Sequence, residues 1–174
     1  AFMVNHGLLK MSPDPSTQQL LVQLGNTIYS TMLANGDKYN SEQKYNEAIA
    51  SFERARWLCS TTTGMVCTEQ VRKGLAQARY GIYHSYLQVA EKAIQNGRLD
   101  IAGNYINQSM EYQKQYASEI ISNNESIQWM GVLCKEYVML GNTLNQKKQY
   151  DQALIEFNKC DSISKIYPTI GDVA

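Results

Sequence analysis

Residues Tyr137–Phe157 read YVMLGNTLNQKKQYDQALIEF, and this stretch decides the fold. Its first part carries apolar or small residues at helical spacing, namely Tyr137, Leu140, Gly141 and Leu144. Such spacing places side chains on one face of a helix. A second apolar stripe, with Ala153 and Phe157, follows a polar break at residues 145–149. Because so short a break leaves room only for a turn, the stretch predicts two antiparallel helices.

The spacing of this stretch occurs three times in the chain. In each copy a small residue is followed after twelve positions by Ala, and four positions later by an apolar residue. The three sets are Gly36, Ala48 and Phe52, then Ala90, Ala102 and Ile106, then Gly141, Ala153 and Phe157. Internal repetition of this kind is the signature of repeat architectures. We therefore expect three helical hairpins with close crossings at Gly36, Ala90 and Gly141.

The three copies resemble the tetratricopeptide-repeat (TPR) family, whose signature is W-x2-L-G-x2-Y, then A-x3-F, then P. The third copy reads Tyr137-x2-Leu140-Gly141-x2-Leu144, then Ala153-x3-Phe157, with Pro168 later. The first reads Met32-x2-Asn35-Gly36-x2-Tyr39, then Ala48-x3-Phe52, and the second, the weakest, Tyr86-x2-Val89-Ala90-x2-Ala93, then Ala102-x3-Ile106. The resemblance covers most of residues 28–165. It implies an all-α fold, a right-handed array of about three antiparallel hairpins forming a TPR-like superhelix.

The repeat length departs from that family. TPR units recur about every 34 residues, whereas Gly36 and Ala90 are 54 positions apart and Ala90 and Gly141 are 51 apart. The extra residues must lie in longer helices or in longer loops between repeats.

Composition restricts the classes of protein that fit. The 174 residues suit one domain, and 16 basic residues balance 16 acidic ones, which gives no basic field for nucleic acid. Apolar residues make up 44% of the chain, but no run approaches the ~18 that a membrane-spanning helix needs. We expect an irregular arm at 1–15, one helical-repeat domain at 16–166 and a tail at 167–174.

The periodic segments predict six helices. Their expected ranges are about 16–40, 45–58, 68–96, 99–122, 126–146 and 150–166. Ser16 and Thr17 are the expected N-terminal cap of the first helix, and Gly97 the left-handed cap that ends the third. The second helix should bury Ala48, Ile49, Phe52, Ala55 and Trp57.

The residues that carry catalysis or bind metals are sparse. The two histidines are His6 and His84, and neither has partners at ligand spacing. No glycine-rich phosphate loop is present. We therefore expect no enzyme activity, no cofactor and no metal.

The TPR resemblance implies a partner surface on the first helix of each repeat. The residues at the matching positions are Leu33, Asp37, Asn40, His84, Leu87, Glu91, Gln95, Lys135, Val138, Asn142 and Asn145. A carboxylate clamp of the family's kind is not expected, because Asp37 and Glu91 would repel a carboxylate. The leading hypothesis is a scaffold that binds a protein or peptide. The alternative is an extracytoplasmic helical domain that binds a small molecule or glycan through its Tyr and Asn/Gln-rich surfaces.

The last hairpin should lack a capping helix, because only residues 167–174 follow it. It should then expose apolar side chains such as Ile155, Ile163 or Ile166 and favour self-association into a homo-oligomer.

Four cysteines bear on the compartment. Cys59 and Cys67 bound one loop, so a disulfide there needs only that the loop fold back. Cys134 and Cys160 lie on facing apolar stripes, where they could form a second bridge or remain free core residues. A loop bridge predicts a periplasmic, secreted or surface-exposed protein, and its absence a cytoplasmic one.

Overall fold

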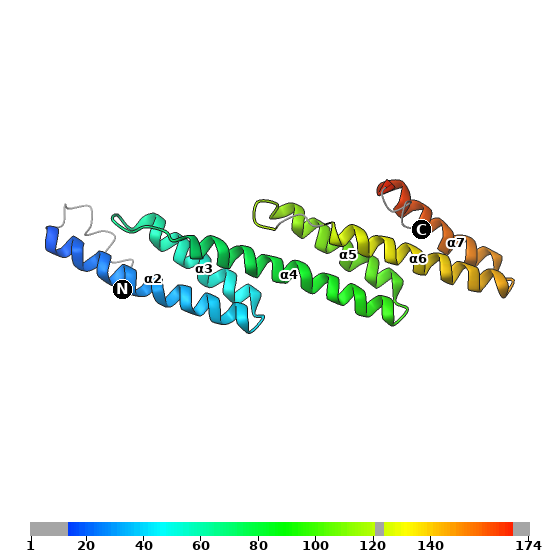
Figure 1. Ribbon diagram of the computed structural model, residues 1–174, viewed down its shortest axis with the longest axis horizontal. Coiled ribbons are helices and arrows are strands. Elements are labelled where there is room, and N and C mark those ends of the chain that lie inside the picture. The colour runs from blue at the N-terminus through cyan, green and yellow to red at the C-terminus, as the bar shows by residue number, and fades with distance from the viewer. Residues whose placement is uncertain (1–13, 121–123, 169–174) are drawn as a thin grey trace. The chain divides into compact units, whose positions relative to one another are not determined.

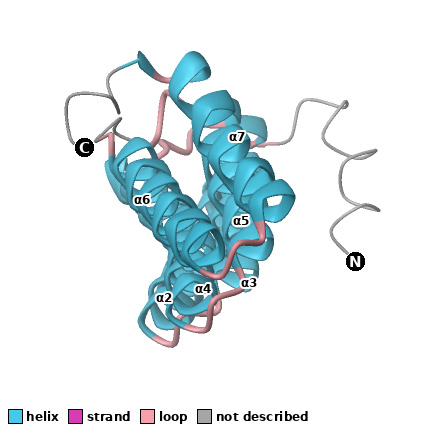
Figure 2. Ribbon diagram, turned by 90° about the vertical axis from the view of Figure 1, so that its right-hand side faces the viewer, coloured by secondary structure: helices cyan, strands magenta, loops and turns pink. Residues whose placement is uncertain are grey.

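The computed structural model describes residues 14–120 and 124–168, and all the regular secondary structure in those ranges is α-helical apart from a single 3₁₀ residue at Pro168. The helices are α2 (Pro15–Ser41), α3 (Tyr45–Thr61), α4 (Glu69–Gln95), α5 (Leu99–Gln115), α6 (Glu125–Gln146) and α7 (Tyr150–Ile166) (Figures 1 and 2). The all-α prediction is therefore confirmed. The chain divides into two compact units, Ala1–Arg79 and Tyr80–Ala174, and the boundary falls within α4. The single-domain reading of residues 16–166 stays a prediction.

The helix bounds follow the sequence prediction closely except at the end of α5. That helix was expected to continue to about residue 122, but it ends at Gln115. The reason is a turn that begins at Tyr116, whose carbonyl accepts the backbone N–H groups of Glu119 and Ile120 at 2.9 Å each. The turn lets Ile120 pack against Tyr83 and become buried.

The cap of α2 also differs from the prediction. Asp14, not Ser16 or Thr17, is the N-cap, and its carboxylate accepts the N–H groups of Ser16 at 2.8 Å and Thr17 at 3.1 Å. Pro15 occupies the first helical position, where its missing N–H leaves nothing unsatisfied. Hydrogen bonds from the Ser16 hydroxyl and the Thr17 N–H hold the pKa of Asp14 at about 2.

The three tight turns share one backbone geometry. Gln43, Gly97 and Lys148 each lie five residues before the repeated Ala, and their φ angles are 59°, 67° and 61°. In each turn the next N–H donates to the carbonyl five residues before it, with N–O distances of 2.9, 2.8 and 3.0 Å. This is the Schellman arrangement, which satisfies the last carbonyls of a helix. The repeated spacing therefore corresponds to a repeated turn.

The close crossings predicted at Gly36 and Gly141 are present. A Cβ on Gly36 would lie 2.6 Å from Cζ of Phe52, and one on Gly141 would lie 2.6 Å from Cε1 of Phe157. We call α2–α3 hairpin 1, α4–α5 hairpin 2 and α6–α7 hairpin 3. In hairpin 2, Ala90 at the equivalent position has no exposed surface.

The residues in excess of the 34-residue repeat lie in the first helix of each pair and in two loops. α2 and α4 each have 27 residues and α6 has 22, whereas α3, α5 and α7 each have 17. Because of the added length, α4 and α6 each pack against two different parts of the chain. The first part of α4 buries Val71 and Leu75 in the core of hairpin 1, and its last part buries Ala90 and Ala93 in the core of the second unit.

α6 is divided in the same way. Near its start, Ser126 donates to the hydroxyl of Tyr83 at 2.9 Å and hydrogen-bonds with Ser109 at 3.0 Å. Near its end, Gly141 receives Phe157 of α7. Each later long helix therefore begins by covering the preceding hairpin and ends by forming its own.

Both cysteine pairs are bridged. The Cα atoms of Cys59 and Cys67 lie 5.2 Å apart, and those of Cys134 and Cys160 lie 4.7 Å apart. The first bridge closes the loop between α3 and α4, and the second joins α6 to α7. No cysteine is free.

Candidate interaction surface

In hairpin 1 the predicted partner positions are occupied by the chain's own α4. The Nδ2 group of Asn40 donates to the carbonyl oxygen of Gly74 at 3.1 Å, and Gln70 donates to the Asp37 carboxylate at 2.6 Å. Leu33 is 6% exposed and lies in the core cluster that includes Val71 and Leu75 of α4. Leu33 and Asn40 are therefore buried, which removes them from the predicted free surface.

In hairpin 2 one of the four predicted positions is buried, and the other three are half-buried or exposed. Leu87 is 1% exposed and packs with Tyr83 and Ile120, so it too leaves the predicted surface. Nδ1 of His84 faces the Glu125 carboxylate of α6 at 4.0 Å. Glu91 is half-buried, and Gln95 is exposed.

In hairpin 3 the predicted positions are open. Lys135, Val138, Asn142 and Asn145 are all exposed, and the exposed fraction of Val138 is 36%. In the repeat register Val138, Asn142 and Asn145 correspond to Leu33, Asp37 and Asn40 of hairpin 1. No helix follows α7 in the part of the chain that the structure describes.

The second helix of hairpin 3, α7, is also more exposed than the equivalent helices α3 and α5. Phe52 of α3 is completely buried between Gly36 and Gly74, whereas its equivalent Phe157 on α7 is only half-buried. Leu154, four residues after the start of α7 at Tyr150, is 58% exposed. Its equivalent in hairpin 2 is Gly103, where an added Cβ would lie 3.3 Å from Cδ2 of Leu133 on the covering helix α6.

These observations define one surface. We call Val138, Asn142, Asn145, Leu154 and Phe157 the open face. It corresponds to the surface that α4 covers in hairpin 1. In hairpin 2 the equivalent of Leu154, Gly103, lies against α6, whereas the predicted partner residue Gln95 is exposed. Ile155 and Ile166 are also exposed, at 54% and 68%, as predicted for the last hairpin, whereas Ile163 is half-buried against the core.

A polar cluster links α5, α6 and α7. The hydroxyl of Tyr137 on α6 donates to the Asp100 carboxylate of α5 at 3.0 Å, and Nζ of Lys159 on α7 donates to the same carboxylate at 2.9 Å. Lys159 also pairs with Glu156 and lies 5.0 Å from the centre of the Tyr137 ring. Burial and the bond to Asp100 raise the pKa of Tyr137, and the bonds from Lys159 and Tyr137 lower the pKa of Asp100.

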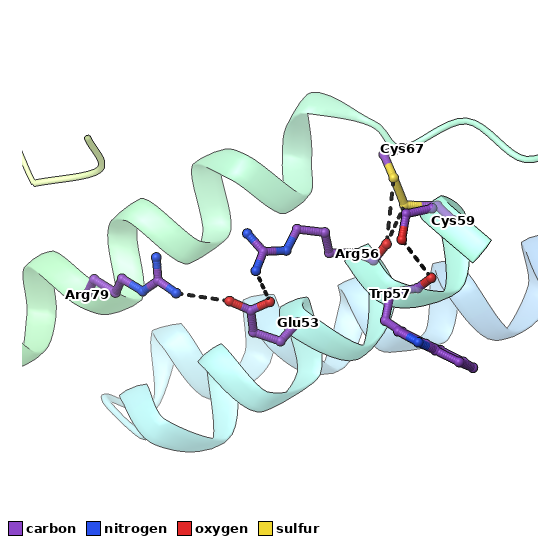
Figure 3. Close-up of polar contacts among 7 residues, drawn as sticks. Glu53, Arg56, Trp57, Cys59, Cys67 and Arg79 are labelled. Atoms are coloured by element: carbon purple, nitrogen blue, oxygen red, sulfur yellow. Dashed lines mark hydrogen bonds and ion pairs between the residues drawn. A yellow bond between two sulfur atoms is a disulfide. The ribbon is translucent and has the colours of Figure 1, made fainter. Parts of the chain in front are cut away.

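Hairpin 1 carries features that the sequence analysis missed. Glu53 lies between the guanidinium groups of Arg79, at 2.9 Å, and Arg56, at 2.5 Å (Figure 3). Arg79 follows Leu75 by four residues and so lies on the apolar stripe of α4. A charged residue on such a stripe was the sequence feature that could have indicated a buried ion pair.

Trp57, expected in the core, is 55% exposed, because the core side of α3 is occupied by Ala48, Phe52 and Ala55.

The tyrosines that suggested a small-molecule or glycan site contact one another. The ring centre of Tyr86 lies 6.3 Å from that of Tyr105 and 6.1 Å from that of Tyr112, which in turn lies 4.8 Å from Tyr116. All four are half-buried. The small-molecule alternative stays a prediction.

No protein-family model matches this chain, and no curated protein matches it. Residues 14–120 and 124–168 include no group of three or more His, Cys, Asp or Glu placed to hold a metal ion. In the same ranges, the helices are too short or too polar to cross a bilayer.

Proposed function

We propose that this chain is a non-enzymatic interaction module, a scaffold that binds a helical segment of a protein on the open face of hairpin 3. One observation carries the proposal. Positions that are buried under the next helix in hairpin 1, such as Leu33 and Asn40, correspond to the exposed Val138 and Asn145 in hairpin 3.

The chemistry of the open face indicates what it would bind. The hairpin 1 equivalents of Val138, Leu154 and Phe157 share one apolar cluster. By that correspondence the three residues form an apolar centre, and the amides of Asn142 and Asn145 lie at its edge. In hairpin 1 the equivalent of Asn145 donates to a helix carbonyl. A partner helix would therefore bring an apolar stripe to the centre and a backbone carbonyl to Asn145.

We also propose that the three hairpins follow one another as a TPR-like array. Support comes from the threefold spacing of small, Ala and apolar residues and from the shared geometry of the three turns. In such arrays each unit covers the face of its neighbour, and no helix after α7 covers hairpin 3 in the residues that the structure describes.

The two disulfides support an oxidising, extracytoplasmic location. Structural disulfides form and persist in secreted, periplasmic and surface proteins, whereas cytosolic thiols are mostly kept reduced. With all four cysteines bridged, we propose a periplasmic, secreted or surface-exposed protein.

Amide NMR tests the proposed binding. The probe is a labelled peptide with the sequence of residues 68–80, the segment that covers hairpin 1 in this chain. We expect shifts at Val138, Asn145 and Leu154, and loss of those shifts in a Leu154→Asp variant. Ile155→Asp is the matched control, because Ile155 is equally exposed but lies outside the open face. Shifts confined to other regions, or none at all, would overturn the proposal.

A further inference from the structure

The first part of α2 carries leucine side chains with large exposed surfaces. Leu20 is 65% exposed and Leu24 is 50% exposed, and Leu21 between them is half-buried. α2 and α4 have equal lengths of 27 residues and the same position relative to Gly36 and Ala90. In that register Leu20, Leu21 and Leu24 correspond to Gly74, Leu75 and Ala78, which α4 buries against hairpin 1.

The exposed side of α2 also lacks charge. No Lys, Arg, Asp or Glu occurs between Asp14 and Asp37. The first part of α4, whose outer side meets solvent, carries Glu69, Arg72 and Lys73 in contrast. Depletion of charged residues marks the core of protein interfaces. The neutral composition of α2 is therefore typical of a surface that becomes covered.

The N-terminal N–H groups of α4 and α2 find their hydrogen-bond acceptors in different places. The N–H of Thr68, before α4, donates to the hydroxyl of Tyr29 in hairpin 1 at 2.7 Å. In hairpin 3 the position of Tyr29 is taken by Cys134, which offers no such acceptor because it is bridged. α2 needs none, because Asp14 already accepts its first N–H groups.

We propose that the occupant of the open face is the first part of α2 from a second copy of this chain, so that the protein associates head to tail. This inference rests on the proposed function and names the partner. Leu21 and Leu24 pack on Val138 and Leu154, as Leu75 and Ala78 pack in hairpin 1. Asn145 donates to the carbonyl of the second copy's α2, as Asn40 donates to Gly74.

The contact differs from hairpin 1 in one detail. A Cβ on Gly74 would overlap the Phe52 ring, yet the corresponding residue of α2 is Leu20. The Phe157 ring must therefore move aside for Leu20 if α2 is to come as close to hairpin 3 as α4 lies to hairpin 1. Phe157 is half-buried, in contrast to the enclosed Phe52, so it has room to rotate away.

A head-to-tail contact uses two different surfaces, so a dimer as a whole leaves one open face and one α2 surface free. Such contacts form rings if the rotation closes and open chains if it does not. Association should therefore continue beyond the dimer as the protein concentration rises.

Sedimentation velocity of the full chain over a wide concentration series tests the inference. We expect Leu24→Asp on α2 and Leu154→Asp on the open face each to weaken self-association by roughly tenfold or more, the loss expected for one buried leucine. Asn26→Asp on α2 and Ile155→Asp on α7 are the controls, since both sites are exposed and lie off the proposed contact. Circular dichroism of each variant checks that the helices are retained.

Mixing the two disruptive variants is the decisive measurement. Leu24→Asp retains an intact open face, and Leu154→Asp retains an intact α2. We therefore expect each to be monomeric alone and the mixture to form a dimer of one copy of each that grows no further.

The remaining outcomes separate the two proposals. A monomeric unmodified protein, or a mixture that stays monomeric, overturns the head-to-tail contact. The same holds if Leu154→Asp abolishes association and Leu24→Asp has no effect, which would indicate that two open faces meet. In each case, peptide binding to the open face by NMR still tests the proposed function independently.

Discussion

Adding a single methyl group at Gly36 should destabilise hairpin 1 more than the same change at Gly141 destabilises hairpin 3. At both positions the new Cβ would lie 2.6 Å from a phenylalanine ring, closer than real Cβ contacts. The two phenylalanine rings differ in how much room they have to move. Phe52 has no exposed surface and is held on its other side by Gly74, whereas Phe157 is half-buried at the open face.

The magnitude follows from two opposing effects. Overpacking a core costs about 1–3 kcal/mol, and replacing Gly by Ala inside a helix gains about 1 kcal/mol. Because Phe52 is enclosed, we take the upper part of the overpacking range, about 2–3 kcal/mol, and expect a net loss of roughly 1–2 kcal/mol for Gly36→Ala. Because Phe157 can rotate toward solvent, Gly141→Ala should be within about 1 kcal/mol of the unmodified chain.

Urea unfolding followed by far-UV circular dichroism, with the disulfides intact, measures both variants. Gly103→Ala is the control, because its Cβ would meet only the flexible end of Leu133 at 3.3 Å and should be neutral or stabilising. If Gly36→Ala proved as stable as the unmodified chain, or less damaging than Gly141→Ala, the enclosed position of Phe52 would be refuted.

Three further predictions concern the turns, the cap and the cysteines. Gln43→Gly and Lys148→Gly should each stabilise the chain by about 0.5–1 kcal/mol in thermal unfolding, because both residues adopt left-handed φ angles that favour glycine; a loss of stability would contradict this. The pKa of Asp14 falls from 3.8 to about 2 on folding, so its contribution to stability is full above pH ~4 and is lost as the pH falls toward ~2. Asp14→Asn should flatten that part of the Tm–pH curve, and an unchanged curve would count against the cap. Alkylation without reduction should add no label to any cysteine, and full labelling would refute both disulfides.

The sequence alone determined the class of fold and the positions of most helices. Apolar residues at helical spacing, together with the threefold pattern around Gly36, Ala90 and Gly141, sufficed because helix formation and tight turns depend on local residues. The end of α5 was predicted wrongly, since the turn at Tyr116 is stabilised by burial of Ile120 against Tyr83, a contact distant in sequence. Trp57 was wrongly predicted to be buried, because helical spacing does not tell which face of α3 packs against α2.

The tertiary structure decided which of the predicted partner residues are accessible. Leu33, Leu87 and Val138 occupy equivalent positions in the three repeats, and nothing in their sequence spacing distinguishes them. Leu33 is buried in the core it shares with the first part of α4, and Leu87 is buried against Ile120, whereas Val138 has no following helix in the described chain. Accessibility is set by what packs next to a residue, and that is a property of the folded arrangement and not of the residue itself.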